Sequence, residues 1–231
     1  DDKLKQTILQ YISENENNAI QNNNTRGKTI YGLLKTIFLS ADEKNNINLT
    51  SVLGIPSIYE IANKDMQDEK GRIVQQVYWY GDEDGKTFFP QFINSFSSKD
   101  WIINPSKEWY EIRSRKGNVW VYANRPLDND ANLDDSAQVH LNRYLEDNDI
   151  HPSVVVHRGH SYWLIRTIRR MSGNAKIVML GSCGGYKNLN DIIEKNPEAH
   201  IISTKEIGTG DINRPILNYM NQAFESGSTL V

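Results

Sequence analysis

Short, wholly apolar runs separated by helical patterns are the feature that most constrains the fold of this chain. The runs 154–156, 177–180 and 201–202 consist only of Val, Ile, Met and Leu, as expected of strands buried on both faces. A further strand-like run spans Ile73–Tyr80, and segments with apolar residues at helical spacing lie between the runs. Strands that alternate with helices indicate βαβ units. The sequence therefore predicts an α/β fold with a mainly parallel central sheet.

Two of these runs lead into chemically active residues. The run 154–156 is followed by His-Arg-Gly-His at 157–160, and the run 177–180 by Gly-Ser-Cys-Gly-Gly at 181–185. Between the two segments there is room for one helix and one strand, the minimum for a right-handed crossover between parallel neighbours. Because function in such folds sits at the carboxyl ends of the strands, we expect both segments to lie side by side at that edge.

The only cysteine of the chain, Cys183, lies in the second segment. A thiol with an ordinary pKa of about 8.5 is mostly protonated at neutral pH, and a neighbouring imidazole can take its proton or stabilise the thiolate. The surrounding glycines allow close approach of a substrate, so Ser182 and Gly184 are predicted to contact it. A buried, space-filling cysteine is the alternative, but glycines pack poorly around such a residue. We expect a nucleophilic pair of Cys183 with His160 or His157.

The chain is predicted to comprise a helical region over residues 1–70 and an α/β domain over residues 71–231. Apolar residues recur at helical spacing over 4–12 and 33–38, and a short helix is expected near Tyr59. Six of the ten residues over 15–24 are asparagine, which predicts a loop. The chain ends soon after its last predicted helix, which is compatible with a domain truncated at its carboxyl end.

The composition is that of a soluble globular protein. Of 231 residues, 38% are hydrophobic and 24% charged, and the net charge of −3 gives no indication of a nucleic-acid or membrane partner. No apolar run approaches the roughly 18 residues of a transmembrane helix, and the first residues lack the basic segment of a signal peptide. A single cysteine excludes an intrachain disulfide and zinc sites built on several thiolates.

At these residues the sequence resembles the clan CD cysteine peptidases, which include caspases, gingipains, clostripain, legumain and separase. In that family an apolar strand ends at a catalytic histidine and a later apolar strand ends at a catalytic cysteine, and residues 73–203 repeat this order. The resemblance implies a caspase-like three-layer sandwich. It also implies a cysteine endopeptidase that needs no cofactor and acts on a peptide or protein substrate.

The histidine motif of the family is usually Gly-His-Gly, and this chain has Gly159-His160-Ser161. The match implies His160 as the base, with His157 as the second choice. It implies the N–H groups of Ser161 and Cys183 as the oxyanion hole. Because Ser161 replaces the second glycine, a catalytically degenerate relative that serves as a binding module is an open alternative.

A rival interpretation uses the same cysteine. Residues 181–185 also fit G-x-C-x-G, the nucleophile elbow of some α/β-hydrolases and class I glutamine amidotransferases. Those folds place the catalytic histidine well after the nucleophile, whereas only His200 follows Cys183, and it begins a predicted strand. The start of a strand lies at the wrong end of the sheet, so the peptidase interpretation is favoured.

An acidic segment over residues 128–134 resembles a calcium loop in its alternating oxygen ligands. It lacks the glycine and the glutamate that such a loop needs at its sixth and twelfth positions. A solvated acidic loop is the favoured interpretation, and the alternative is a Ca²⁺ site formed by Asp128, Asp130, Asn132 and Asp134.

The resemblance also bears on specificity. In many clan CD peptidases the residue two before the catalytic cysteine helps line the pocket for the side chain that precedes the cleaved bond. Here that residue is Gly181, which offers no charge. A preference for basic substrates would need a carboxylate from elsewhere, and we expect Asp82 or Asp84 to supply it unless this acidic turn faces water.

Overall fold

The computed structural model describes residues 2–54 and 60–230, and the chain divides into two compact units, Asp1–Ile58 and Tyr59–Val231. The boundary therefore precedes the one expected at residue 70. The short helix α4 (Asn63–Met66) belongs to the second unit, where Ile61 also pairs with Leu230.

The first unit is helical, as predicted. Its elements are α1 (Asp2–Gln21), α2 (Thr25–Ser40), the 3-10 turn η1 (Glu43–Asn45) and α3 (Leu49–Leu53). The loop predicted over residues 15–24 is wrong, because α1 continues through most of it. The side-chain amides of Asn15 and Asn22 donate back to carbonyls one turn earlier, at 2.8 and 2.9 Å. Tyr59, near which a further helix is expected, lies outside the described residues.

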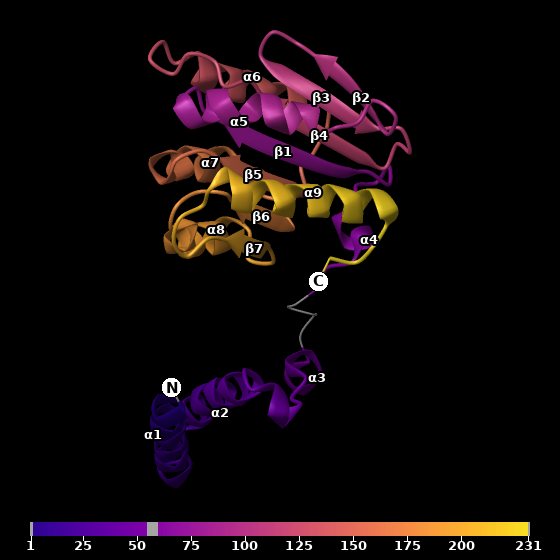
Figure 1. Ribbon diagram of the computed structural model, residues 1–231. Coiled ribbons are helices and arrows are strands. Elements are labelled where there is room, and N and C mark those ends of the chain that lie inside the picture. Colours follow the sequence, from indigo (N-terminus) through magenta and orange to yellow (C-terminus); the bar gives the residue numbers. More distant parts are fainter. Residues whose placement is uncertain (1, 55–59, 231) are drawn as a thin grey trace. The chain divides into compact units, whose positions relative to one another are not determined.

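The second unit is built on a seven-stranded sheet, which confirms the predicted α/β class and mainly parallel arrangement (Figure 1). The strand order is β2-β3-β4-β1-β5-β6-β7, and only β3 runs against the others. The strands are β1 (Ile73–Trp79), β2 (Trp101–Pro105), β3 (Trp109–Ser114), β4 (Val119–Asn124), β5 (Val154–Arg158), β6 (Ile177–Leu180) and β7 (His200–Ser203).

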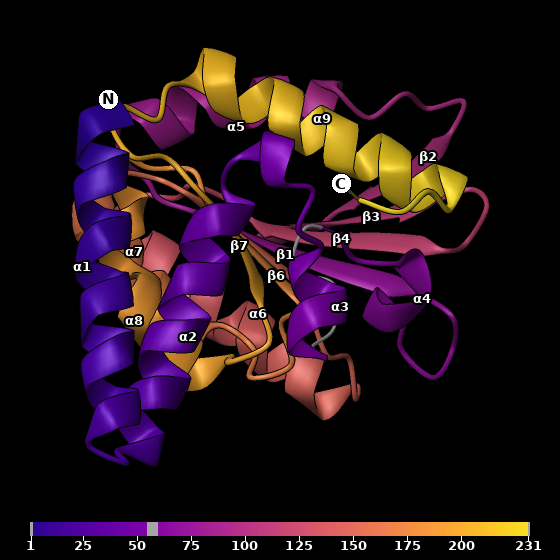
Figure 2. The same ribbon diagram turned by 90° about the horizontal axis from the view of Figure 1, so that it is seen from below.

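Helices cover both faces of this sheet (Figure 2). On one face, α5 (Glu83–Asn94) and α9 (Gly210–Ser226) pack Phe89, Phe92, Leu217 and Phe224 against the strands. On the other face lie α6 (Leu133–Asp147), α7 (Leu164–Arg170) and α8 (Leu189–Lys195). Burial of both faces explains the wholly apolar runs of the central strands. Among the described residues, no helix is both long and apolar enough to cross a membrane.

The central strand β5 positions the candidate site. It pairs with β1 on one side and with β6 on the other, with His157 opposite Leu180. Successive side chains of a strand point to opposite faces. Val155 and His157 therefore face α7, whereas Val156 and Arg158 face α5 and α9. The segments after β5 and β6 emerge next to each other, as the sequence predicts.

Candidate active site

A pocket of about 230 Å³ opens at the carboxyl edge of the sheet. Five of the residues singled out in the sequence lie in its wall: Asp84, His160, Gly181, Ser182 and Cys183. Residues 207–210, which lead into the first turn of α9, close another side. The structure therefore brings the predicted nucleophile and the predicted base into one cavity. His157, Ser161, Asp82 and Gly184 are not in its wall.

Cys183 is exposed on a tight turn that the next loop supports. The N–H of Gly184, whose φ is +60°, donates to the carbonyl of Glu206 at 2.7 Å. The hydroxyl of Thr204 donates to the carbonyl of Ser182. The backbone of Gly208 lies so close that a Cβ there would be 2.8 Å from the same carbonyl oxygen. These contacts hold the thiol at the pocket, and they give Gly184 a structural role.

His160 is half-exposed in the pocket wall. Its side chain is 41% exposed, and its Nε2 lies 3.5 Å from Oδ2 of Asp84, whose side chain is 57% exposed. The imidazole stacks on the ring of Tyr162, with centroids 5.1 Å apart. The preceding residue must be small, because a Cβ on Gly159 would lie 2.6 Å from the Tyr80 ring. His160 is therefore placed to accept and release a proton in contact with water or substrate.

His157 is fully buried on the opposite face of β5. Its Nδ1 lies 2.7 Å from the hydroxyl of Thr167, and its Nε2 lies 3.1 and 3.3 Å from the carbonyls of Gly159 and His160. Carbonyls only accept, so Nε2 carries the proton and Nδ1 accepts from Thr167. Burial lowers the pKa of His157 to about 4, since the charged ring would be desolvated. This histidine supports the His160 loop from below and faces no substrate.

Asp82 is occupied by contacts within the fold. Its Oδ1 caps α5 by accepting from the N–H of Gly85 at 2.8 Å, and its Oδ2 accepts from the indole N–H of Trp163 at 3.0 Å. Trp163 ends the 3-10 turn η2 (Ser161–Trp163) and stacks flat on Tyr80. The carboxylate of Asp82 therefore ties the His160 loop to the start of α5, which gives it a positioning role in place of the expected substrate contact.

The two amides expected to bind an oxyanion have no competing partner in the fold. Within residues 2–54 and 60–230, neither the N–H of Ser161 nor that of Cys183 donates a hydrogen bond. Both N–H groups thus remain available to a ligand, although only Cys183 lies in the pocket wall itself.

The acidic segment before α6 uses its oxygens locally. Oδ1 of Asp128 accepts from the N–H of Asp130 at 3.0 Å, and the buried Asp134 accepts from the N–H of Gly81 at 2.9 Å. Asn132 caps α6 in a left-handed conformation. Among the described residues there is no group of three His, Cys, Asp or Glu side chains arranged to hold a metal ion. The structure thus gives Asp134 the role of anchoring this loop to the end of β1.

One residue of the pocket wall went unrecognised in the sequence. Arg158 is the last residue of β5, and only 7% of its surface is exposed. The signal that identifies it is strand alternation: if His157 faces one layer, Arg158 must face the other, where the pocket lies.

Comparison of the chain with protein-family models, curated proteins and solved structures gave no match.

Proposed function

We propose that the second unit is a cysteine endopeptidase of the clan CD type, with Cys183 as nucleophile and His160 as base. One observation carries the proposal. An exposed thiol and a half-exposed imidazole follow two hydrogen-bonded parallel strands and line the same pocket. Neither of these side chains is buried. The second histidine, His157, is buried and hydrogen-bonded to Thr167 and to the carbonyl of Gly159.

The chemistry follows from these two groups. The Cys183 sulfur attacks the scissile carbonyl carbon, while its proton passes to His160. The N–H groups of Ser161 and Cys183 stabilise the oxyanion. As the C–N bond breaks, His160 donates the proton to the leaving amine, and a thioester remains on Cys183. Water then attacks the thioester while His160 takes one of its protons. The C–S bond breaks, the acid product leaves, and His160 returns the proton to the Cys183 sulfur. Asp84 helps to orient the imidazole.

The same proposal includes a caspase-like arrangement of the sheet. It is supported by the histidine strand β5 lying directly beside the cysteine strand β6, with helices on both faces. The elbow interpretation is disfavoured, because His200 pairs with Ile177 at the amino end of β6, away from Cys183.

The test combines peptide cleavage with thiol reactivity in the full chain. Products from a peptide library would be identified by mass spectrometry, and alkylation of Cys183 by iodoacetamide would be timed at neutral pH. We expect Cys183→Ala to abolish cleavage and His160→Ala to lower it by about 10²–10⁴-fold. We also expect Cys183 to react faster than glutathione, and His160→Ala to remove this advantage.

His140→Ala is the matched control. His140 is an exposed histidine paired with Glu108 at 2.9 Å and lies outside the pocket wall, so its loss should leave both rates unchanged. Full cleavage by His160→Ala would refute the assignment of the base. A Cys183 that reacts no faster than glutathione, in a chain that cleaves nothing, would favour the binding-module alternative.

A further inference from the structure

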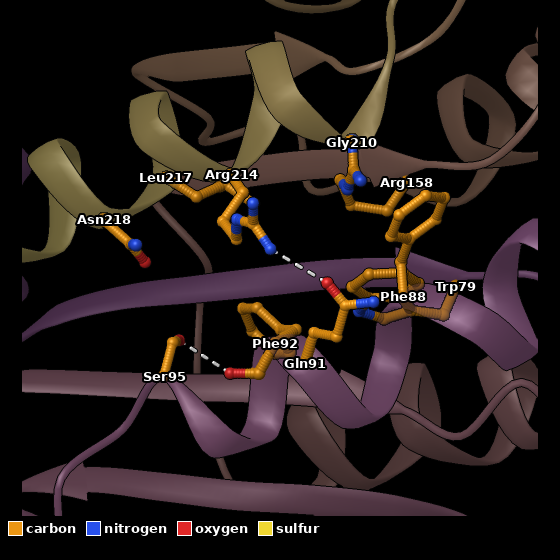
Figure 3. A pocket seen from close by; sticks show the side chains of 10 residues that line it. All are labelled: Trp79, Phe88, Gln91, Phe92, Ser95, Arg158, Gly210, Arg214, Leu217 and Asn218. Atoms are coloured by element: carbon orange, nitrogen blue, oxygen red, sulfur yellow. Dashed lines mark hydrogen bonds between the residues drawn. The ribbon is translucent and has the colours of Figure 1, made fainter.

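Arg158 is a buried cation at the active-site pocket. Its guanidinium carbon lies 5.4 Å from the centre of the Trp79 ring. Figure 3 shows a second pocket, which shares Arg158 with the active-site pocket; there Arg158 lies beside Phe88 and Trp79, where α9 begins at Gly210. This apolar setting removes most of its water, and burial lowers its pKa to about 10. The side chain is therefore still charged at neutral pH.

Among the residues that the structure describes, none pairs with this charge at contact distance. Within the described parts of the chain, the Arg158 side chain has no hydrogen bond and no ion pair, and its Nε is fully buried without a partner. The nearest influence of opposite sign is Asp84, which acts on Arg158 at longer range and lies closer to His160. An unpaired buried charge strongly destabilises a fold, because the charge has lost its water and gained no counter-charge. A fold retains it at a pocket when a ligand supplies the missing anion.

The position of the guanidinium relative to the nucleophile is fixed by Gly181. A Cβ at Gly181 would lie 3.0 Å from Nη1 of Arg158, so the guanidinium occupies the space that a side chain would fill two residues before Cys183. Arg158, Gly181 and Cys183 all line the same cavity. A substrate held at the thiol therefore places its neighbouring side chain near this cation.

We infer that Arg158 determines specificity by binding a carboxylate side chain of the substrate next to the cleaved bond, an inference that rests on the proposed peptidase function. Guanidinium and carboxylate match in a bidentate geometry, and a neutral or basic side chain would leave the buried cation unpaired. The substrate preference inferred from Arg158 is thus opposite to the basic preference expected from Asp82 and Asp84. Asp82 is bound by Gly85 and Trp163, and Asp84 lies against His160.

The first experiment does not require peptidase activity. Iodoacetate and iodoacetamide alkylate thiols by the same reaction and differ in one negative charge. We define the alkylation ratio as the rate with iodoacetate divided by the rate with iodoacetamide. We expect this ratio at Cys183 to exceed the ratio at glutathione by at least about fivefold, because an unpaired cation attracts the anionic reagent. Arg158→Met should return the ratio to that of glutathione, and Arg158→Lys should keep part of the effect.

Two controls separate a local effect from folding and from net charge. Arg158→Met replaces an unpaired charge by an apolar side chain of similar volume, so its free energy of unfolding should be equal to or higher than that of the parent. Lys187→Gln removes the same charge from an exposed lysine whose stem approaches Gly184. It should leave the ratio of alkylation rates unchanged.

The second experiment compares peptides that differ only by Asp or Asn beside the cleaved bond. We expect kcat/KM to favour Asp by about tenfold or more in the parent, and Arg158→Met to remove the preference. Equal alkylation ratios in parent and Arg158→Met, or a parent that prefers neutral or basic residues, would overturn the inference. An Arg158-dependent ratio in a chain that cleaves nothing would refute the peptidase proposal while leaving the anion site in place.

Discussion

The two faces of β5 differ, at its carboxyl end, in whether their polar side chains are hydrogen-bonded within the fold. On the α7 side, His157 is buried with both ring nitrogens hydrogen-bonded, and Thr167 links it to the hydroxyl of Tyr80 at 2.8 Å. On the pocket side, Nε of Arg158 and the Ser182 hydroxyl are buried without hydrogen-bond partners among the described residues, and His160 is half-exposed. The first network stabilises the fold, whereas the second leaves groups available to a ligand.

The difference teaches how two histidines three residues apart can have unrelated roles. The strand sends His157 into the α7 layer, and the chain leaves the sheet before His160. The sequence motif does not distinguish the two imidazoles. Burial and hydrogen bonding distinguish them, and the two roles can be tested by measuring the stability of each variant separately from its activity.

The largest effect on stability should come from replacing His157, and it is measured by comparing His157→Ala with His160→Ala. We expect His157→Ala to lower the free energy of unfolding by about 3–4 kcal/mol, because it removes the hydrogen bonds to Thr167 and to the carbonyls of Gly159 and His160 and leaves a cavity. It should retain part of the activity in the folded fraction. His160→Ala should change stability by no more than about 0.5 kcal/mol while losing activity. Urea unfolding of each variant provides the measurement, and equal destabilisation by the two would break the comparison.

A pH dependence follows from the buried ring. The pKa of His157 falls from 6.5 to about 4, chiefly by desolvation, with smaller contributions from the nearby Arg158 and His160. Between pH 6.5 and pH 4 the His157 imidazole binds a proton in the unfolded chain and stays neutral in the folded chain. The stability is therefore complete above pH 6.5 and falls by about 3 kcal/mol as the pH drops to 4.

Unfolding measured over pH 4–7 would isolate this contribution by comparing the parent with His157→Gln. The glutamine does not titrate, so the slope in this window should become shallower. His151→Ala serves as the control, since His151 is exposed and paired with Asp149. An identical slope in parent and His157→Gln would show that His157 is not the group responsible.

The smallest effect concerns the link between His157 and Thr167. Thr167→Val keeps the shape but removes the hydroxyl that donates to Nδ1, which should cost about 1–2 kcal/mol. In the His157→Ala background the same substitution should cost less, because the hydroxyl then keeps only its hydrogen bond with Tyr80. A double-mutant cycle of unfolding free energies measures this coupling. Strictly additive effects would mean that the hydrogen bond contributes no stability.

Much of the fold could be predicted because burial leaves a direct trace in the sequence. The central strands β5 and β6 appear as apolar runs, since helices cover both of their faces. The edge strand β2 was not predicted, although it begins with the apolar run 101–103: the run is cut off by Asn104 and Pro105, and most of the strand's residues are exposed. The asparagines of α1 misled for a related reason: their preference for loops was overridden where Asn15 bonds back to its own helix.

The candidate site was only partly readable for a different reason. Cys183 and His160 could be found because their position after strands is a property of local sequence. The buried Arg158 could not. Its significance depends on the finding that no carboxylate of the described residues lies within contact distance of it, and this is decided by segments distant in the chain. Likewise, the sequence cannot show that Asp82 is engaged by Trp163, 81 residues further on.

The close backbone contacts at the pocket carry a consequence for how such a chain can evolve. At Gly159, Gly181 and Gly208 a single added carbon would lie within 3 Å of a neighbouring ring or carbonyl. At Gly173 none of the described residues lies within 4 Å of that position. An added side chain is therefore accommodated at Gly173 and penalised at these three positions of the pocket. Among descendants of this gene, the shape of the pocket should change more slowly than the residues around it, since it depends on positions that cannot accept a side chain.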